Sequence, residues 1–128
     1  MRAVVLRTHG GPEVLTIEEV DDPAPGRDDI VVDVEHTAIN RADILQRMGM
    51  YPDPRRRSVE IPGLEFAGVV SAVGTDVTGW SIGDRAMGIE AGGCYAGKVV
   101  THARQALPVP ASVPSADAAA IPEVFLTA

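Results

Sequence analysis

The side chains that most often bind metals are few in this chain and lie far apart. The three histidines, His9, His36 and His102, show neither the HxxxH nor the HExxH spacing that places two imidazoles on one helix face. Cys94 is the single cysteine, so a cysteine zinc cluster and an internal disulfide bond are excluded. The sequence therefore predicts no metal site. The lone thiol fits a reducing, cytoplasmic setting, and an inert, partly buried Cys94 is favoured over a reactive one.

A dinucleotide cofactor needs a glycine-rich turn between a strand and a helix, because backbone amides must approach the pyrophosphate there. No GxGxxG sequence occurs among the 13 glycines of the chain. The main element that would hold such a cofactor is therefore not expected within these 128 residues.

The composition describes one acidic domain with enough apolar residues for a core. The chain has 128 residues, of which 45% are hydrophobic, and a formal net charge of −7. Nucleic acid is disfavoured as a partner, because its phosphates would be repelled. No apolar run approaches the roughly 18 residues of a membrane span, and the N-terminus lacks the features of a signal peptide. The arginine run at 55–57 is interpreted as a solvated loop, although it could also bind a phosphate.

Many short, β-rich runs separated by Gly and Pro turns predict an antiparallel barrel or sandwich. Ala67 and Gly68 permit close packing inside one of these runs. After Asn40 the apolar spacing becomes helical, which predicts a short helix near 41–48. Further helical turns are expected at 112–120, and a helix begins at Glu123. The expected strands are Ala3–Arg7, Leu15–Val20, Ile30–Thr37, Glu65–Val73, Arg85–Gly88, Tyr95–Thr101 and Ala106–Val109.

Four stretches together resemble the medium-chain dehydrogenase/reductase superfamily, with their order and spacing intact along essentially the whole chain. They are MRAVV with GGPEVL at 10–15, AINRADILQR at 38–47 with Gly49 and Tyr51, PGLEFAGVV at 62–70 continuing to Gly83-Asp84-Arg85, and AAAIPEVFLTA at 118–128.

Within that superfamily the chain resembles the zinc-independent branch. Zinc-dependent alcohol dehydrogenases have Gly-His-Glu where this chain has Gly63, Leu64 and Glu65, and they carry a cysteine ligand near Asn40. Leucine removes the nitrogen ligand and leaves a weak carboxylate candidate. The four-cysteine lobe that binds a structural zinc is also missing. Glu65 is expected to be structural and to bond loop amides.

The sequence NRAD at 40–43, followed by Gln46, Gly49 and Tyr51, is most similar to quinone oxidoreductases of the tumour-suppressor-inducible type. The resemblance implies a GroES-like, partly closed β-barrel over residues 1–120. Residues 121–128 would begin the helix that leads into a Rossmann domain, which the chain lacks. NADPH would bind mainly to that domain, and a quinone or other conjugated carbonyl would enter the cleft between the two.

By the same resemblance, Asn40 and Tyr51 would be catalytic and Thr127 would bind the cofactor. Hydride transfer to a quinone requires close approach, exclusion of water and donors for the oxygen that gains charge. Tyr51 offers a phenol and Asn40 an amide. The alternative is that Asn40 caps the helix that starts at Arg41 and that Tyr51 only fills a loop; Asn40 is also able to do both.

Two other functions remain open. An enoyl-thioester reductase is the nearer rival, because reductase modules of fatty-acid and polyketide synthases share the NxxD, Tyr and FLTA features. A non-enzymatic module that resembles a co-chaperonin subunit belongs to a different class. We also expect a homodimer or larger assembly, because Ile121, Val124, Phe125 and Leu126 would form an apolar face.

Overall fold

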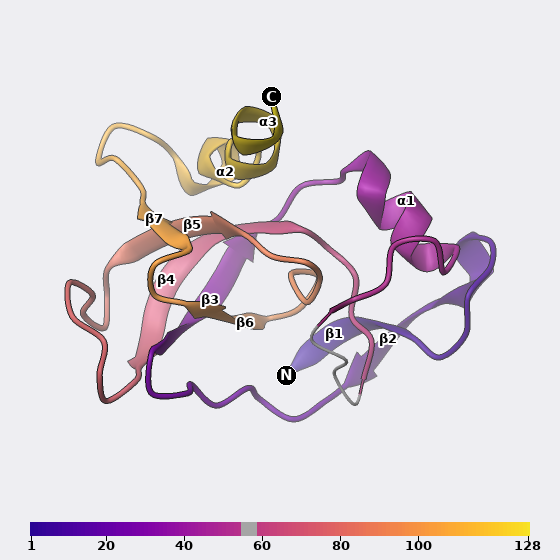
Figure 1. Cartoon of the computed structure of the whole chain (residues 1–128), viewed down its shortest axis with the longest axis horizontal. Coiled ribbons are helices and arrows are strands. Elements are labelled where there is room, and N and C mark those ends of the chain that lie inside the picture. Colours follow the sequence, from indigo (N-terminus) through magenta and orange to yellow (C-terminus); the bar gives the residue numbers. More distant parts are fainter. Residues whose placement is uncertain (55–58) are drawn as a thin grey trace.

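The computed structural model describes residues 1–54 and 59–128. The arginine run at 55–57, interpreted above as a solvated loop, lies outside the described residues. The described chain forms a larger sheet that curls into a half-barrel, a separate hairpin and several short helices (Figure 1). This arrangement confirms the predicted mainly β, partly closed barrel.

The larger sheet has five strands in the order β6–β3–β4–β5–β7, and each neighbouring pair is antiparallel. Its two longest strands lie at the centre, where β-branched and aromatic residues favour a pleated, buried surface. Ile30, Val32, Phe66 and Val70 on these strands are almost completely buried and form the main core. The strands of this sheet are β3 (Asp29–His36), β4 (Glu65–Val73), β5 (Arg85–Ile89), β6 (Lys98–His102) and β7 (Ala106–Pro108).

The close contact of β3 with β4 depends on small residues in β4, as the sequence predicts. A side-chain carbon added to Gly68 would overlap the carbonyl oxygen of Asp33 on the neighbouring strand. Ala67 beside it is completely buried. The pairing register also shifts between Val34 and His36, opposite these residues. The end of β3 is thereby bent, and the chain leaves the sheet towards Asn40.

The N-terminal hairpin pairs β1 (Arg2–Leu6) with β2 (Leu15–Glu19), and the turn η1 (Pro12–Val14) lies between them. The predicted strand over 95–101 is partly wrong, because β6 begins only at Lys98. The preceding residues pair with β1 instead: the amide of Val4 donates to the carbonyl of Tyr95, and the amide of Gly97 donates to Arg2. The chain therefore pairs first with β1, over residues 95–97, and then with β3, through β6.

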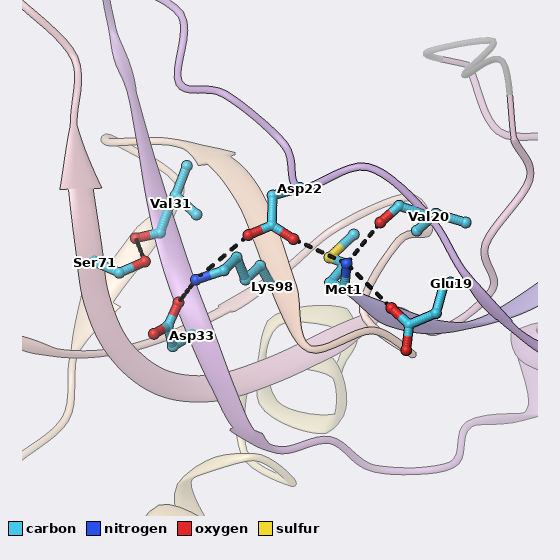
Figure 2. Close-up of polar contacts among 8 residues, drawn as sticks. All are labelled: Met1, Glu19, Val20, Asp22, Val31, Asp33, Ser71 and Lys98. Carbon is cyan, nitrogen blue, oxygen red and sulfur yellow. Dashed lines mark hydrogen bonds and ion pairs between the residues drawn. The ribbon is translucent and has the colours of Figure 1, made fainter.

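Charged groups reinforce this junction between the hairpin and the barrel (Figure 2). The N-terminal ammonium of Met1 lies 2.9 Å from Asp22 and donates to the carbonyl of Val20 at 2.6 Å. Lys98 on β6 reaches Asp33 on β3 at 2.6 Å and lies 3.9 Å from Asp22. The Lys98 ammonium lowers the pKa of Asp33, and that carboxylate raises the pKa of Lys98. These contacts lie in a part of the chain that carries none of the predicted site residues.

Three α-helices complete the described chain: α1 (Arg41–Arg47), α2 (Ser115–Ala118) and α3 (Pro122–Thr127). None of these described helices is long and apolar enough to cross a membrane. The helix predicted near 41–48 is confirmed, whereas the region 112–120 forms only the single turn of α2. Pro114 stands directly before α2 and is its N-terminal boundary, so the helix does not extend back to residue 112.

Helices α2 and α3 lie beside each other over β4 and β5 (Figure 1). Ala118 and Ala119 are buried against Ala67 and Met87 of the sheet. Ile121, expected in the exposed apolar face, is half-buried and packs against this cluster. The exposed face of α3 is therefore smaller than predicted and contains Val124, Phe125 and Leu126.

Candidate functional site

Asn40 lies where the chain leaves β3 and enters α1. It is the N-cap residue of this helix, with an extended backbone, and it forms a capping box with Asp43. The backbone amide of Asn40 donates to Asp43 Oδ2 at 2.7 Å. The capping role predicted as an alternative for Asn40 is therefore present in the structure.

The side-chain amide of Asn40 has a second attachment, on β4. Its Nδ2 donates to Glu65 Oε1 at 2.7 Å. The other oxygen of that carboxyl group, Oε2, accepts the backbone amide of Glu123 in α3 at 3.0 Å. Glu65 is only 1% exposed. Glu65 thus bonds amides, although they are a side-chain amide and a helix backbone amide and not the loop amides that the sequence predicted. It connects the beginning of α1 with the beginning of α3.

A second buried carboxyl group lies next to this connection. Asp43 Oδ2 also accepts the hydroxyl of Tyr95 at 2.6 Å. Burial raises the pKa of Asp43, and its bonds to Tyr95 and Asn40 oppose that rise. Burial and the Asp43 carboxylate together hold the pKa of Tyr95 far above its usual range. Tyr95 is therefore a committed hydrogen-bond donor, and Asp43 holds both this ring and the cap of α1.

Sequence reasoning did not assign Asp43 and Tyr95 to the site. An acidic residue three positions after the Asn40 cap is a recognisable capping signal, so Asp43 could have been found. No sequence signal marks Tyr95, which lies 52 residues away from Asp43 along the chain. Only folding brings these two side chains together.

The position at which zinc-dependent alcohol dehydrogenases carry a histidine is apolar and closed in this chain. Leu64 is 3% exposed, directly before Glu65. Cys94, near it in the fold, is completely buried, which fits an inert thiol better than a reactive one. Across residues 1–54 and 59–128, no group of three His, Cys, Asp or Glu side chains is arranged to hold a metal ion.

Tyr51 and Thr127 differ from Asn40 in their surroundings. Tyr51 follows α1, is 36% exposed, and makes no hydrogen bond through its phenol to a described residue. Thr127, on the last turn of α3, is exposed and donates its hydroxyl to the carbonyl of Glu123 at 2.6 Å. The structure therefore links Asn40 through Glu65 to the helix that carries Thr127. It shows no hydrogen bond from Asn40 or from Thr127 to Tyr51.

A groove of about 740 Å³ lies between the end of β3, α1 and the N-terminal hairpin. Its walls are mainly apolar and include Ile39, Ile44 and the ring of Tyr95. None of the three predicted site residues is among the described residues that line it. Asp43 and Tyr95 line this groove and also belong to the hydrogen-bonded group that includes Asn40 and Glu65. The groove therefore lies beside that group.

One serine stands in a pattern typical of hydrolase nucleophiles, GWSIG at 79–83. A nucleophile elbow requires a strand before the serine and a helix after it. Here Ser81 lies in a turn, its amide donates to Asp84 at 2.7 Å, and strand β5 follows. The surroundings of Ser81 do not match such an elbow.

Comparison with known proteins identifies the domain. Residues 26–111 match the family model of the alcohol dehydrogenase GroES-like domain. The chain is 38% identical over 123 residues to the mycocerosic acid synthase-like polyketide synthase of Mycobacterium tuberculosis, which is 96% of this chain and 6% of that protein.

Two solved structures superpose on nearly the whole chain. The human synaptic vesicle membrane protein VAT-1 homolog-like protein gives a TM-score of 0.91 at 32% identity, over 99% of this chain and 41% of that one. The quinone oxidoreductase of Escherichia coli, complexed with NADPH, gives 0.87 at 34% identity, over 94% and 37%. The chain spans less than half the length of each of these proteins. It belongs to the alcohol dehydrogenase GroES-like domain family and corresponds to the N-terminal part of medium-chain dehydrogenases/reductases.

Proposed function

We propose that this chain is the catalytic-side domain of a zinc-independent, NADPH-dependent quinone oxidoreductase. Residues 1–120 form the GroES-like domain, and residues 121–128 lead towards a Rossmann domain that holds most of the cofactor. The substrate is a quinone or a related conjugated carbonyl compound, bound in the cleft between the two domains. The proposal includes a cytoplasmic location and a homodimeric or larger assembly.

The observation that carries this proposal is the Asn40–Glu65–α3 connection beside an apolar Leu64. In the zinc-dependent branch this position supplies a metal-binding nitrogen, whereas here it supplies a buried leucine. The polar groups around it are paired with one another as hydrogen-bond donors and acceptors. The quinone oxidoreductase of Escherichia coli, complexed with NADPH, is similar over 94% of the chain, which supports the same reading.

The residues present fit a nicotinamide better than a zinc ion. Thr127 Oγ1 gives its hydrogen to Glu123, so its lone pairs can accept a hydrogen bond from an amide such as the nicotinamide carboxamide. Bound NADPH supplies the hydride, and the quinone becomes a hydroquinone after taking a proton from water. Thr127 then helps to orient the cofactor, and no protein nucleophile is needed.

The protein's task in this reaction is to orient the acceptor and to stabilise the oxygen that gains negative charge. The Asn40 amide has two N–H groups, of which Glu65 occupies one. The second N–H and the Tyr51 phenol are the donors proposed for the quinone oxygen. Each such donor contributes on the order of 3 kcal/mol to lowering a barrier when water is excluded.

An enoyl-thioester reductase is the second candidate, and the similarity to the mycobacterial polyketide synthase favours it. Both reactions deliver hydride to a conjugated acceptor. The test is a steady-state comparison, on the full-length protein with NADPH, of an ortho-quinone and a crotonyl thioester. Our proposal predicts the higher kcat/KM for the quinone, and a preference for the thioester would transfer the assignment to the second candidate.

The non-enzymatic, co-chaperonin-like module is the alternative of another class. It would require ring-shaped assembly and no reductase activity. Absence of NADPH oxidation with both acceptors, together with closed rings in solution, would favour that class.

A further inference from the structure

Glu65 occupies an unusual place for an acidic side chain. Glu65 is the first residue of β4 and is 1% exposed. Both of its carboxyl oxygens accept hydrogen bonds, one from the Asn40 side-chain amide and one from the backbone amide of Glu123. The hydroxyl of Thr37 also donates to its backbone carbonyl at 2.6 Å. Burying a carboxyl group is costly unless such bonds compensate, so this geometry is strongly constrained.

The acceptor character of Glu65 decides how Asn40 is oriented. A carboxylate accepts hydrogen bonds and donates none, so the NH₂ group of Asn40, and not its oxygen, must face Glu65. The same amide is confined on its other side by the capping box with Asp43. One N–H of Asn40 is thereby committed, and the direction of the second is fixed.

The second bond of Glu65 extends this order to α3. Glu123 lies four residues before Thr127, one helical turn away, and Thr127 closes that turn by donating to the Glu123 carbonyl. The groups proposed to contact the substrate and the cofactor are therefore attached to one buried carboxyl group.

We infer that Glu65 is a positioning residue for the proposed hydride transfer: it aligns the Asn40 amide with the turn of α3 that carries Thr127. The inference rests on the proposed function. If Glu65 only stabilised the fold, its removal would lower stability without a specific link to Asn40.

The orientation of Asn40 is measurable directly, because Asn40 is the only asparagine in the 128 residues. Selective ¹⁵N-asparagine labelling therefore gives a single side-chain NH₂ signal pair for the chain. In Glu65→Gln, which keeps the side-chain volume, we expect this pair to shift and its exchange with water to accelerate about tenfold or more. An unchanged pair would overturn the inference. Glu18→Gln, which removes the charge of the half-buried partner of Arg7 far from Asn40 in the sequence, is the matched control and should leave the pair unchanged.

The kinetic part uses the full-length protein with NADPH and an ortho-quinone. Glu65→Gln should lower kcat about 10- to 100-fold with little change in either KM, since the donor is misaligned and not removed. The double variant Asn40→Ala/Glu65→Gln should be no slower than Asn40→Ala alone. Fully additive losses would mean that Glu65 acts only through stability. If the unmodified protein does not reduce quinones, the proposed function fails, while the asparagine signals still decide whether Glu65 orients Asn40.

Discussion

The two tyrosines of the chain present the same phenol in opposite settings. Tyr95 is bound to Asp43 at 2.6 Å, and its pKa is held far above the usual range by burial and by that carboxylate. Tyr51 is partly exposed, with its phenol unbonded to described residues. At the scale of single residues, Tyr95 therefore serves the structure, whereas the Tyr51 hydroxyl is the one proposed above to contact a ligand.

Asp43 gives a prediction about the pH dependence of stability. Burial raises its pKa above the ordinary 3.8, so the folded chain keeps this proton to higher pH than the unfolded chain does. Its favourable contribution to folding is complete below pH 3.8 and is lost as the pH rises through the raised pKa. Asparagine does not titrate, so Asp43→Asn should gain stability relative to the unmodified chain as the pH rises above 3.8.

Urea unfolding at several pH values measures this difference. Asp117→Asn, an exposed carboxylate on α2, is the control and should show a much smaller change in relative stability. A relative stability of Asp43→Asn that falls with rising pH would show that burial does not dominate at Asp43.

Thr127 gives a prediction about cofactor binding in the full-length protein. Thr127→Val keeps the shape of the side chain and removes the hydroxyl that now bonds to Glu123. Losing one neutral hydrogen bond, worth about 1 kcal/mol, should raise the KM for NADPH about fivefold and leave the KM for the quinone nearly unchanged. Equal changes in both constants would argue against a cofactor contact. Thr127→Ser retains the hydroxyl and is the control.

At the scale of elements, β3 and β4 form the central pair of the larger sheet, and their backbones approach most closely at Gly68. Gly68→Ala would place a methyl group on the carbonyl oxygen of Asp33. The strands would have to separate, and the free energy of unfolding should fall by about 3 kcal/mol. Chemical unfolding measures this loss. Gly97→Ala is the control, because its new carbon would lie 3.7 Å from the nearest atom, and it should change stability by less than about 0.5 kcal/mol. Equal stability of both variants would contradict the close approach.

Most elements could be predicted because their signals are local. Alternating and β-branched runs between Gly and Pro turns located the strands, and β4 has the predicted bounds. The predicted beginning of β6 was wrong because Tyr95 and Ala96 pair with β1, a partner more than 90 residues away in the sequence. Such pairing depends on the closed sheet and leaves no local pattern.

The candidate site could be predicted only in part, for the same reason. Asn40 was found through its resemblance and its position before a helix, and its capping role is confirmed. The partners that fix it come from distant elements: Glu65 from β4 and, through Asp43, Tyr95. The sequence indicated that Glu65 bonds amides, but not which amides, because that choice depends on how α1 and α3 pack against the barrel.

At the scale of the whole molecule, α3 leaves an apolar surface. Phe125 is 74% exposed, and Val124 and Leu126 beside it are more than half exposed. Surfaces of this kind drive association. We expect the 128-residue chain to form dimers or larger assemblies, and the double change Phe125→Ser/Leu126→Ser should raise the dissociation constant about tenfold or more.

Light scattering over a range of concentrations measures this association. Ile82→Ser, at a 71% exposed position in the turn before β5, is the control and should leave association unchanged. A chain that is monomeric at all concentrations, with or without the double change, would show that α3 does not drive assembly.

We propose that this domain supplies hydrogen-bond donors for the quinone oxygen through Tyr51 and Asn40. The direct measurement is the turnover of the full-length protein with NADPH and an ortho-quinone, in Tyr51→Phe and in Asn40→Ala. Tyr51→Phe removes only the phenol hydroxyl, so we expect turnover to fall about 10- to 1000-fold at unchanged cofactor affinity. Asn40→Ala should lower turnover further, because it also removes a helix cap worth about 1 kcal/mol. Unchanged turnover in both variants would contradict the account and would leave this domain as a wall that shapes the cleft by proximity alone.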